Sequence, residues 1–113
     1  MHEIGVVTAM VNTVVHYCEE NQVAQVAEIV VQIGELSLVL PEYVQQLYPM
    51  VADGTMLQDT ELIIETVPGM AICEDCDDVF NVIQHEGVCP SCGSRNKTVL
   101  SGRDFSIKEL HVP

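Results

Sequence analysis

Four of the five cysteines form two Cys-x-x-Cys pairs, Cys73 with Cys76 and Cys89 with Cys92. Twelve residues separate the pairs, a spacing that lets two short turns bring four thiolates together around a Zn²⁺ ion. The alternatives are two disulfides or a redox pair, although a redox pair usually occurs singly at the start of a helix. Because a four-thiolate site has no open position for water or substrate, the spacing predicts a structural zinc site without catalytic chemistry.

The other residues near these pairs, and the fifth cysteine, are not expected to bind the metal. Gly93 follows the last cysteine and tolerates the positive φ that such a turn often needs. Arg95 and Lys97 are expected to offset part of the negative charge of the thiolates and nearby carboxylates, or to be ordinary solvated cations. His85 lies between the pairs, but four thiolates make a further ligand unnecessary. Cys18 lies on the apolar stripe of a predicted helix and is expected to be a packed core residue.

The other candidate site is the N-terminal sequence Met1-His2-Glu3. An α-amine, the amide nitrogen of His2 and its imidazole lie within chelating reach of one another, and nitrogen donors in a plane suit Ni²⁺ or Cu²⁺. A histidine at the second position is more often an ordinary polar residue, so chemistry alone leaves this site open. His16 and His111 are each expected to be packed or surface imidazoles.

Two predicted helices must position these residues. Residues 3–20 place apolar side chains at helical spacing. The second helix begins at Pro41, which suits a first turn, and ends before Asp53-Gly54. Pro49 lies inside it, and because an internal proline removes a hydrogen bond, it predicts a kink or an early end there.

Three strands are predicted from alternation. The first lies between Val23 and Gly34, the second covers residues 61–67, and the third covers residues 103–112. In the third strand, strict alternation places one set of side chains on one face, namely Phe105, Ile107, Glu109 and His111.

This order predicts an α+β fold, a small mixed sheet of about three strands with two helices. A zinc-ribbon-like lobe with four cysteines is inserted before the last strand. The predicted domains are therefore residues 1–68 together with 99–113 as one body, and residues 69–98 as the zinc-binding lobe. Long connections at both ends of the lobe would permit a homodimer or a domain-swapped dimer.

Charge restricts the class of partner. The chain has 17 Asp and Glu against 4 Lys and Arg, a formal net charge of −13, and its first 94 residues hold no Lys or Arg. Such a chain repels phosphate backbones and anionic lipids, so nucleic acid and membrane surfaces are poor partners. No apolar run approaches the length of a bilayer span, and no basic region typical of a signal peptide stands at the start, which favours the cytoplasm.

Several motifs together resemble the HypA/HybF family of hydrogenase nickel-incorporation proteins. They are Met1-His2-Glu3 before a helix, Ile33 to Ser37 (Ile-Gly-Glu-Leu-Ser) after a strand, the two cysteine pairs, and Ser101-Gly102 before the last strand. The resemblance covers essentially the whole chain. It implies a cytoplasmic nickel metallochaperone, not an enzyme, that takes part in maturation of [NiFe] hydrogenase.

The resemblance also assigns residues and partners. The nickel histidine of the family falls on His2, with Glu3 as a supporting residue, and its structural zinc ligands fall on the four paired cysteines. Nickel is then a transient cargo, and the implied partners are the hydrogenase large subunit and a maturation GTPase. Urease maturation occurs in some members of the family. Pro49 and the acidic stretch from Glu74 to Asp78 depart from the usual character of the family.

Two other classes of function compete with this one. A zinc-ribbon adaptor for nucleic acid or for a protein partner would use the same cysteine pairs, but the absence of a basic stripe argues against nucleic acid. A small metalloenzyme would need a base such as Glu35 or His85 beside an open metal, and the expected zinc site is closed.

Overall fold

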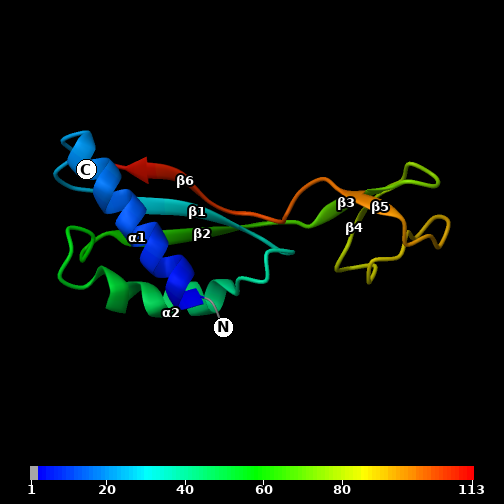
Figure 1. Ribbon diagram of the computed structural model, residues 1–113, viewed down its shortest axis with the longest axis horizontal. Coiled ribbons are helices and arrows are strands. Elements are labelled where there is room, and N and C mark those ends of the chain that lie inside the picture. The colour runs from blue at the N-terminus through cyan, green and yellow to red at the C-terminus, as the bar shows by residue number, and fades with distance from the viewer. Residues whose placement is uncertain (1–2) are drawn as a thin grey trace.

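The computed structural model describes residues 3–113, which form an elongated molecule of 53 × 27 × 18 Å. Its radius of gyration is 17.4 Å, whereas a compact chain of this length would have about 13 Å. Figure 1 shows the reason: a larger body with both helices lies at one end, and a small lobe of short strands lies at the other. The elements in chain order are α1 (Glu3–Glu20), β1 (Glu28–Gly34), α2 (Pro41–Ala52), β2 (Glu61–Val67), β3 (Met70–Cys73), β4 (Val79–Asn81), β5 (Lys97–Val99) and β6 (Phe105–His111).

The body is a three-stranded mixed sheet packed against two helices. Its strand order is β2-β1-β6, with β1 parallel to β2 and antiparallel to β6. A parallel pair needs a crossover connection, and α2 supplies it between β1 and β2. Fully buried side chains of α1, such as Val11, and of β1, such as Ile29, belong to one core with Val44 of α2. The predicted α+β class is therefore confirmed, with the strand β1 beginning at Glu28 rather than near Val23.

The helix α2 continues through Pro49 and ends at Ala52, so an end of the helix at the proline is excluded. Pro49 removes only one hydrogen bond, and its own carbonyl accepts the N–H of Asp53 at 3.1 Å. Both Tyr48 and Ala52 are buried against the body, and the Tyr48 hydroxyl donates to the carbonyl of Thr60 at 3.0 Å. Burial of the side chains of Tyr48 and Ala52, on both sides of Pro49, therefore stabilises the last turn of α2.

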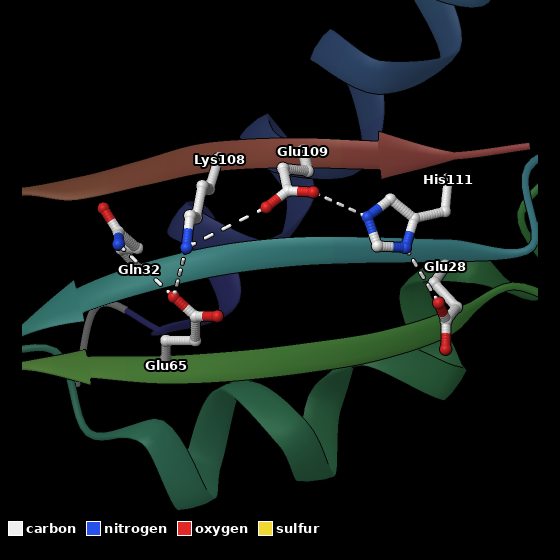
Figure 2. A network of polar contacts seen from close by, with 6 residues as sticks. All are labelled: Glu28, Gln32, Glu65, Lys108, Glu109 and His111. Atoms are coloured by element: carbon white, nitrogen blue, oxygen red, sulfur yellow. Dashed lines mark hydrogen bonds and ion pairs between the residues drawn. The ribbon is translucent and has the colours of Figure 1, made fainter.

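A β-bulge in β6 changes which side chains of the last strand lie on the core side of the sheet, compared with the prediction. Val30 pairs with Glu109 and Val31 pairs with Ile107, so Lys108 is an extra residue without a partner on β1. The bulge places Leu110, rather than Glu109, on the core side with Phe105 and Ile107. Figure 2 shows the result on the outer face of the sheet, where Lys108, Glu109 and His111 lie together. The strict alternation predicted for residues 103–112 was wrong because one inserted residue inverts every later position.

The lobe is a second three-stranded sheet, in the order β4-β3-β5, with both pairs antiparallel. Its buried cluster consists of Ala71, Cys73, Phe80 and Cys89. These strands have three or four residues each, which is too short for hydrophobic periodicity to reveal them, and the sequence predicted no strand here.

Three glycines allow the chain segments between the two sheets to cross closely. A Cβ on Gly34 would lie 2.0 Å from the carbonyl oxygen of Gly102, and one on Gly102 would lie 2.6 Å from the Cα of Gly69. Gly102 also has a φ of +92°, which L residues with side chains rarely adopt. Glycine is therefore required at positions 34, 69 and 102, where any side chain would clash.

Glu35 adds a polar connection at the same junction. Its Oε1 accepts the N–H of Gly69 at 2.8 Å and the side-chain amide of Asn81 at 3.0 Å. The Gly69 N–H, followed by the Asn81 amide, lowers the pKa of this carboxyl group. Glu35 therefore links the end of β1 to β4 of the lobe.

Candidate metal centres

The four paired cysteines converge in the lobe, as their spacing predicts. One ligand atom from each lies within 4.8 Å of the others, with Sγ–Sγ distances of 3.6 Å for Cys73–Cys92 and 3.5 Å for Cys76–Cys89. Tetrahedral Zn²⁺ with Zn–S bonds of about 2.3 Å requires sulfurs about 3.8 Å apart, whereas a disulfide requires about 2.05 Å. None of the five cysteines forms a disulfide. The cluster is therefore consistent with structural zinc and inconsistent with the disulfide alternative.

The two cysteine turns have the same backbone structure. In the first, Cys73 donates its N–H to the carbonyl of Asp78 and accepts the N–H of Asp77. In the second, Cys89 donates its N–H to Ser94 and accepts the N–H of Gly93, at matching positions. Asp77 and Gly93 occupy equivalent places with φ values of +64° and +78°. The prediction of a positive φ at Gly93 is confirmed, and an aspartate meets the same demand in the first turn.

Backbone N–H groups also point at the sulfurs. Burial alone would raise the pKa of Cys89, but the N–H groups of Cys92 and Ser91, with the neighbouring thiols, lower it to about 7. The N–H of Asp78 donates to the sulfur of Cys76 and the N–H of Ser94 donates to that of Cys92, which lowers the two pKa values, but the neighbouring thiols and burial outweigh these donors and raise the pKa of Cys92 and that of Cys76, the latter to about 12. Such donors stabilise thiolates, which are the form of cysteine that binds metal.

Polar side chains hold the loops of the lobe together. Asp75 accepts hydrogen bonds from the Ser94 hydroxyl and the Asn96 side chain, and Asp78 accepts one from Ser91 at 2.7 Å. The acidic residues near the cysteines therefore act as acceptors between the two turns. The Lys97 ammonium donates to the carbonyl oxygens of Gly87 at 3.1 Å and Arg95 at 3.0 Å, so it binds the loop backbone.

The predicted nickel residue His2 lies outside the described residues, which begin at Glu3. Glu3 opens α1 and is buried, with 5% of its surface exposed. Its Oε2 accepts the N–H of Leu40 at 3.4 Å, so the carboxylate connects the start of α1 to the residue before α2.

The remaining candidates lie apart from the cysteine cluster. The ring of His85 packs edge-on against Phe80, with ring centroids 6.2 Å apart, and is not a member of the four-cysteine group. His16 is exposed and pairs with Glu20 at 2.7 Å. Cys18 is fully buried in the body, where burial raises its pKa, which confirms its assignment to the core.

Sequence reasoning missed the polar network of the sheet face. His111 lies between two carboxylates, 2.9 Å from Glu28 and 2.7 Å from Glu109, and Lys108 lies 3.0 Å from Glu65 (Figure 2). The two carboxylates, Glu109 first, raise the pKa of His111, and Glu65 raises that of Lys108. The register shift at Lys108 gathers these groups, and no sequence pattern marks it.

An α+β body joined to a small sheet with four convergent thiols defines a two-part protein with a zinc-ribbon-like lobe. Among the described residues, no helix is long and apolar enough to cross a membrane. The chain belongs to the HypA family, because the family model described as "Hydrogenase/urease nickel incorporation, metallochaperone, hypA" matches residues 1–112. The resemblance seen in the sequence motifs is thereby confirmed.

Individual members of the family match this chain over nearly their full length. The hydrogenase maturation factor HypA of Geobacter sulfurreducens is 34% identical over 113 residues, covering 99% of both chains. That of Methanocella arvoryzae is also 34% identical, over 99% of this chain and 98% of its own. The solution structure of the Ni metallochaperone HypA from Helicobacter pylori matches with a TM-score of 0.70 and 25% identity, covering 99% of this chain and 97% of that one.

Proposed function

We propose that this chain is a nickel metallochaperone that binds Ni²⁺ at its N-terminus and helps to insert it into the large subunit of a [NiFe] hydrogenase. The observation that carries the proposal is the family match over residues 1–112, whose description names nickel incorporation. The relatives named as hydrogenase maturation factors favour hydrogenase as the recipient. Delivery of a metal needs reversible binding and no bond-making catalysis, so the protein is not proposed to be an enzyme.

In this proposal the two metals occupy separate parts of the molecule. His2 supplies the imidazole for nickel, and Glu3 supports it from the first turn of α1, where its carboxylate is already fixed by Leu40. Zinc is held by Cys73, Cys76, Cys89 and Cys92 and stabilises the lobe. A site with few protein ligands suits nickel, the cargo that must be released. Four thiolates suit zinc, the ion that remains bound.

The domain boundaries and partners follow the same proposal. Residues 1–68 and 99–113 form the nickel-binding domain, and residues 69–98 form the zinc-binding domain. The partners are the hydrogenase large subunit and a maturation GTPase in the cytoplasm. The net charge of −13 disfavours nucleic acid and anionic membranes as partners, and it favours basic protein surfaces.

Calorimetric titration of the zinc-loaded protein with Ni²⁺ tests the site. His2→Ala should abolish specific nickel binding and leave zinc content unchanged, because it removes the imidazole without touching the lobe. An N-terminal extension should weaken nickel binding if the amine contributes, whereas the same extension after Pro113 should not. His16→Ala and His85→Ala are matched controls and should bind nickel as the parent protein does. Unchanged nickel affinity in His2→Ala would refute the site.

A further inference from the structure

The last strand of the body leaves one edge of the sheet open. Among the described residues β6 pairs only with β1, and β6 is the outermost strand of the sheet in Figure 2. The carbonyl of Asp104 faces β1, since it accepts the N–H of Gly34 at 2.9 Å. Because successive residues of a strand direct their backbone groups to opposite sides, Phe105 and Ile107 direct theirs away from β1. These backbone groups are free to pair with another strand.

Two apolar hollows lie along this edge, between α1 and β6. One, of about 330 Å³, is lined by Val6, Ala9 and Met10 of the helix and by Phe105 and Ile107 of the strand. The other, of about 450 Å³, extends toward Tyr17 and Leu110. Thr13 and Ile107 line both hollows, so the two lie next to each other along the strand, and together they are called the groove between α1 and β6. Alternate side chains of an extended segment, about 6.7 Å apart, would enter such a groove in turn.

The opposite face of the same edge is polar and acidic. Three carboxylates, Glu28, Glu65 and Glu109, lie there against two cations, Lys108 and a protonated His111, so the residues drawn in Figure 2 carry one net negative charge. Lys108 is paired with Glu65 at 3.0 Å, and His111 is paired with Glu28 at 2.9 Å and with Glu109 at 2.7 Å. A second copy of this chain would also bring a net charge of −13, so like-charge repulsion disfavours pairing between two copies. A basic partner is attracted instead.

We propose that β6 is a docking edge for a partner protein that adds an extended segment of alternating apolar and basic residues to the sheet. The apolar side chains of this segment enter the groove between α1 and β6, and its basic side chains lie over the acidic face. Its main chain hydrogen-bonds to Phe105 and Ile107, which is the recognition mode of strand addition. This surface is separate from the proposed nickel site, and the inference does not use that site.

A synthetic peptide tests the proposal. The probe has seven residues, lysine alternating with valine, and it is titrated into zinc-loaded, ¹⁵N-labelled protein while amide chemical shifts are recorded. The largest shifts should fall at Phe105, Ile107 and Ala9. The same peptide with N-methyl groups on the amides that would face β6 should bind about tenfold more weakly or less, because strand addition depends on main-chain hydrogen bonds.

Two protein variants complete the experiment. Ala9→Phe fills the groove from an exposed helical position and should also weaken binding of the peptide about tenfold. Thr8→Phe adds the same ring at an exposed helical position outside the groove and should leave binding unchanged. Equal binding of the plain and N-methylated peptides would overturn the proposal, since only charge attraction would then remain. A dimer that Ala9→Phe dissociates in sedimentation would overturn it in favour of a second copy.

Discussion

The body and the lobe are stabilised by different means. Fourteen buried residues from both helices, the sheet and the segments that connect them form the core of the body. Four buried residues form the core of the lobe, and two of those four are the cysteines Cys73 and Cys89. Apolar burial at about 25 cal/mol per Å² therefore accounts for the body and leaves the lobe without a comparable source of stability. This comparison indicates that zinc stabilises the lobe, as the hydrophobic core stabilises the body.

The largest expected effect is loss of the lobe without zinc. Cys73→Ala removes one of four thiolates, and structural zinc contributes on the order of 10 kcal/mol to the folding of small metal-binding domains. The amide signals of β3, β4 and β5 should collapse to unfolded positions, while those of β1 and β2 should stay dispersed. Elemental analysis and NMR measure this. Cys18→Ala, which removes a buried thiol from the body, is the control and should keep its zinc. One zinc per chain at normal affinity in Cys73→Ala would contradict the four-thiolate site.

The converse change tests the body. Leu57 is fully buried in its core, so Leu57→Ala should lower the free energy of unfolding of the body by about 2–5 kcal/mol. Urea denaturation measures the loss, and zinc content should remain one per chain because no lobe residue is altered. If zinc affinity fell in parallel with body stability, the two regions would be folding as one unit.

The junction should give a smaller effect that is shared by both regions. Gly34→Ala places a Cβ 2.0 Å from the Gly102 carbonyl oxygen, and forcing the backbones apart should cost about 1–3 kcal/mol. Gly5→Ala is the matched control in α1, where a Cβ meets nothing within 4 Å; there alanine should add about 0.5–1 kcal/mol. Thermal unfolding of both variants makes the comparison. A Gly34→Ala protein as stable as the parent would show that the junction is not tightly packed.

The smallest expected effect is a pH dependence confined to the body. Folding raises the pKa of His111, through Glu109 and then Glu28, so the protonated ring stabilises the native state. This contribution is complete below the unfolded pKa of about 6.5 and is lost as pH rises through the higher folded value. The stability difference between the parent and His111→Gln should therefore be largest near pH 6 and shrink toward pH 9. Denaturation at several pH values measures it, and a difference that grew with pH would have the wrong sign.

Sequence patterns predicted the long elements and the convergence of the four paired cysteines, because both depend on local spacing. The helix Glu3–Glu20 and the strand Glu61–Val67 follow directly from periodicity, and the cysteine pairs follow from the geometry of tetrahedral coordination. Features that depend on tertiary pairing were missed. The bulge at Lys108 is defined only by the pairing of β6 with β1. The hydrogen bond from the Gly69 N–H to the Glu35 carboxylate joins residues that are 34 positions apart.

The most direct test of the account is the content of both metals in two variants, measured after loading with zinc and then nickel. The account predicts that His2→Ala retains one zinc and loses specific nickel, and that Cys73→Ala loses zinc while its folded body still binds nickel. Loss of nickel in Cys73→Ala together with normal nickel in His2→Ala would contradict the account, because it would place the nickel site in the lobe.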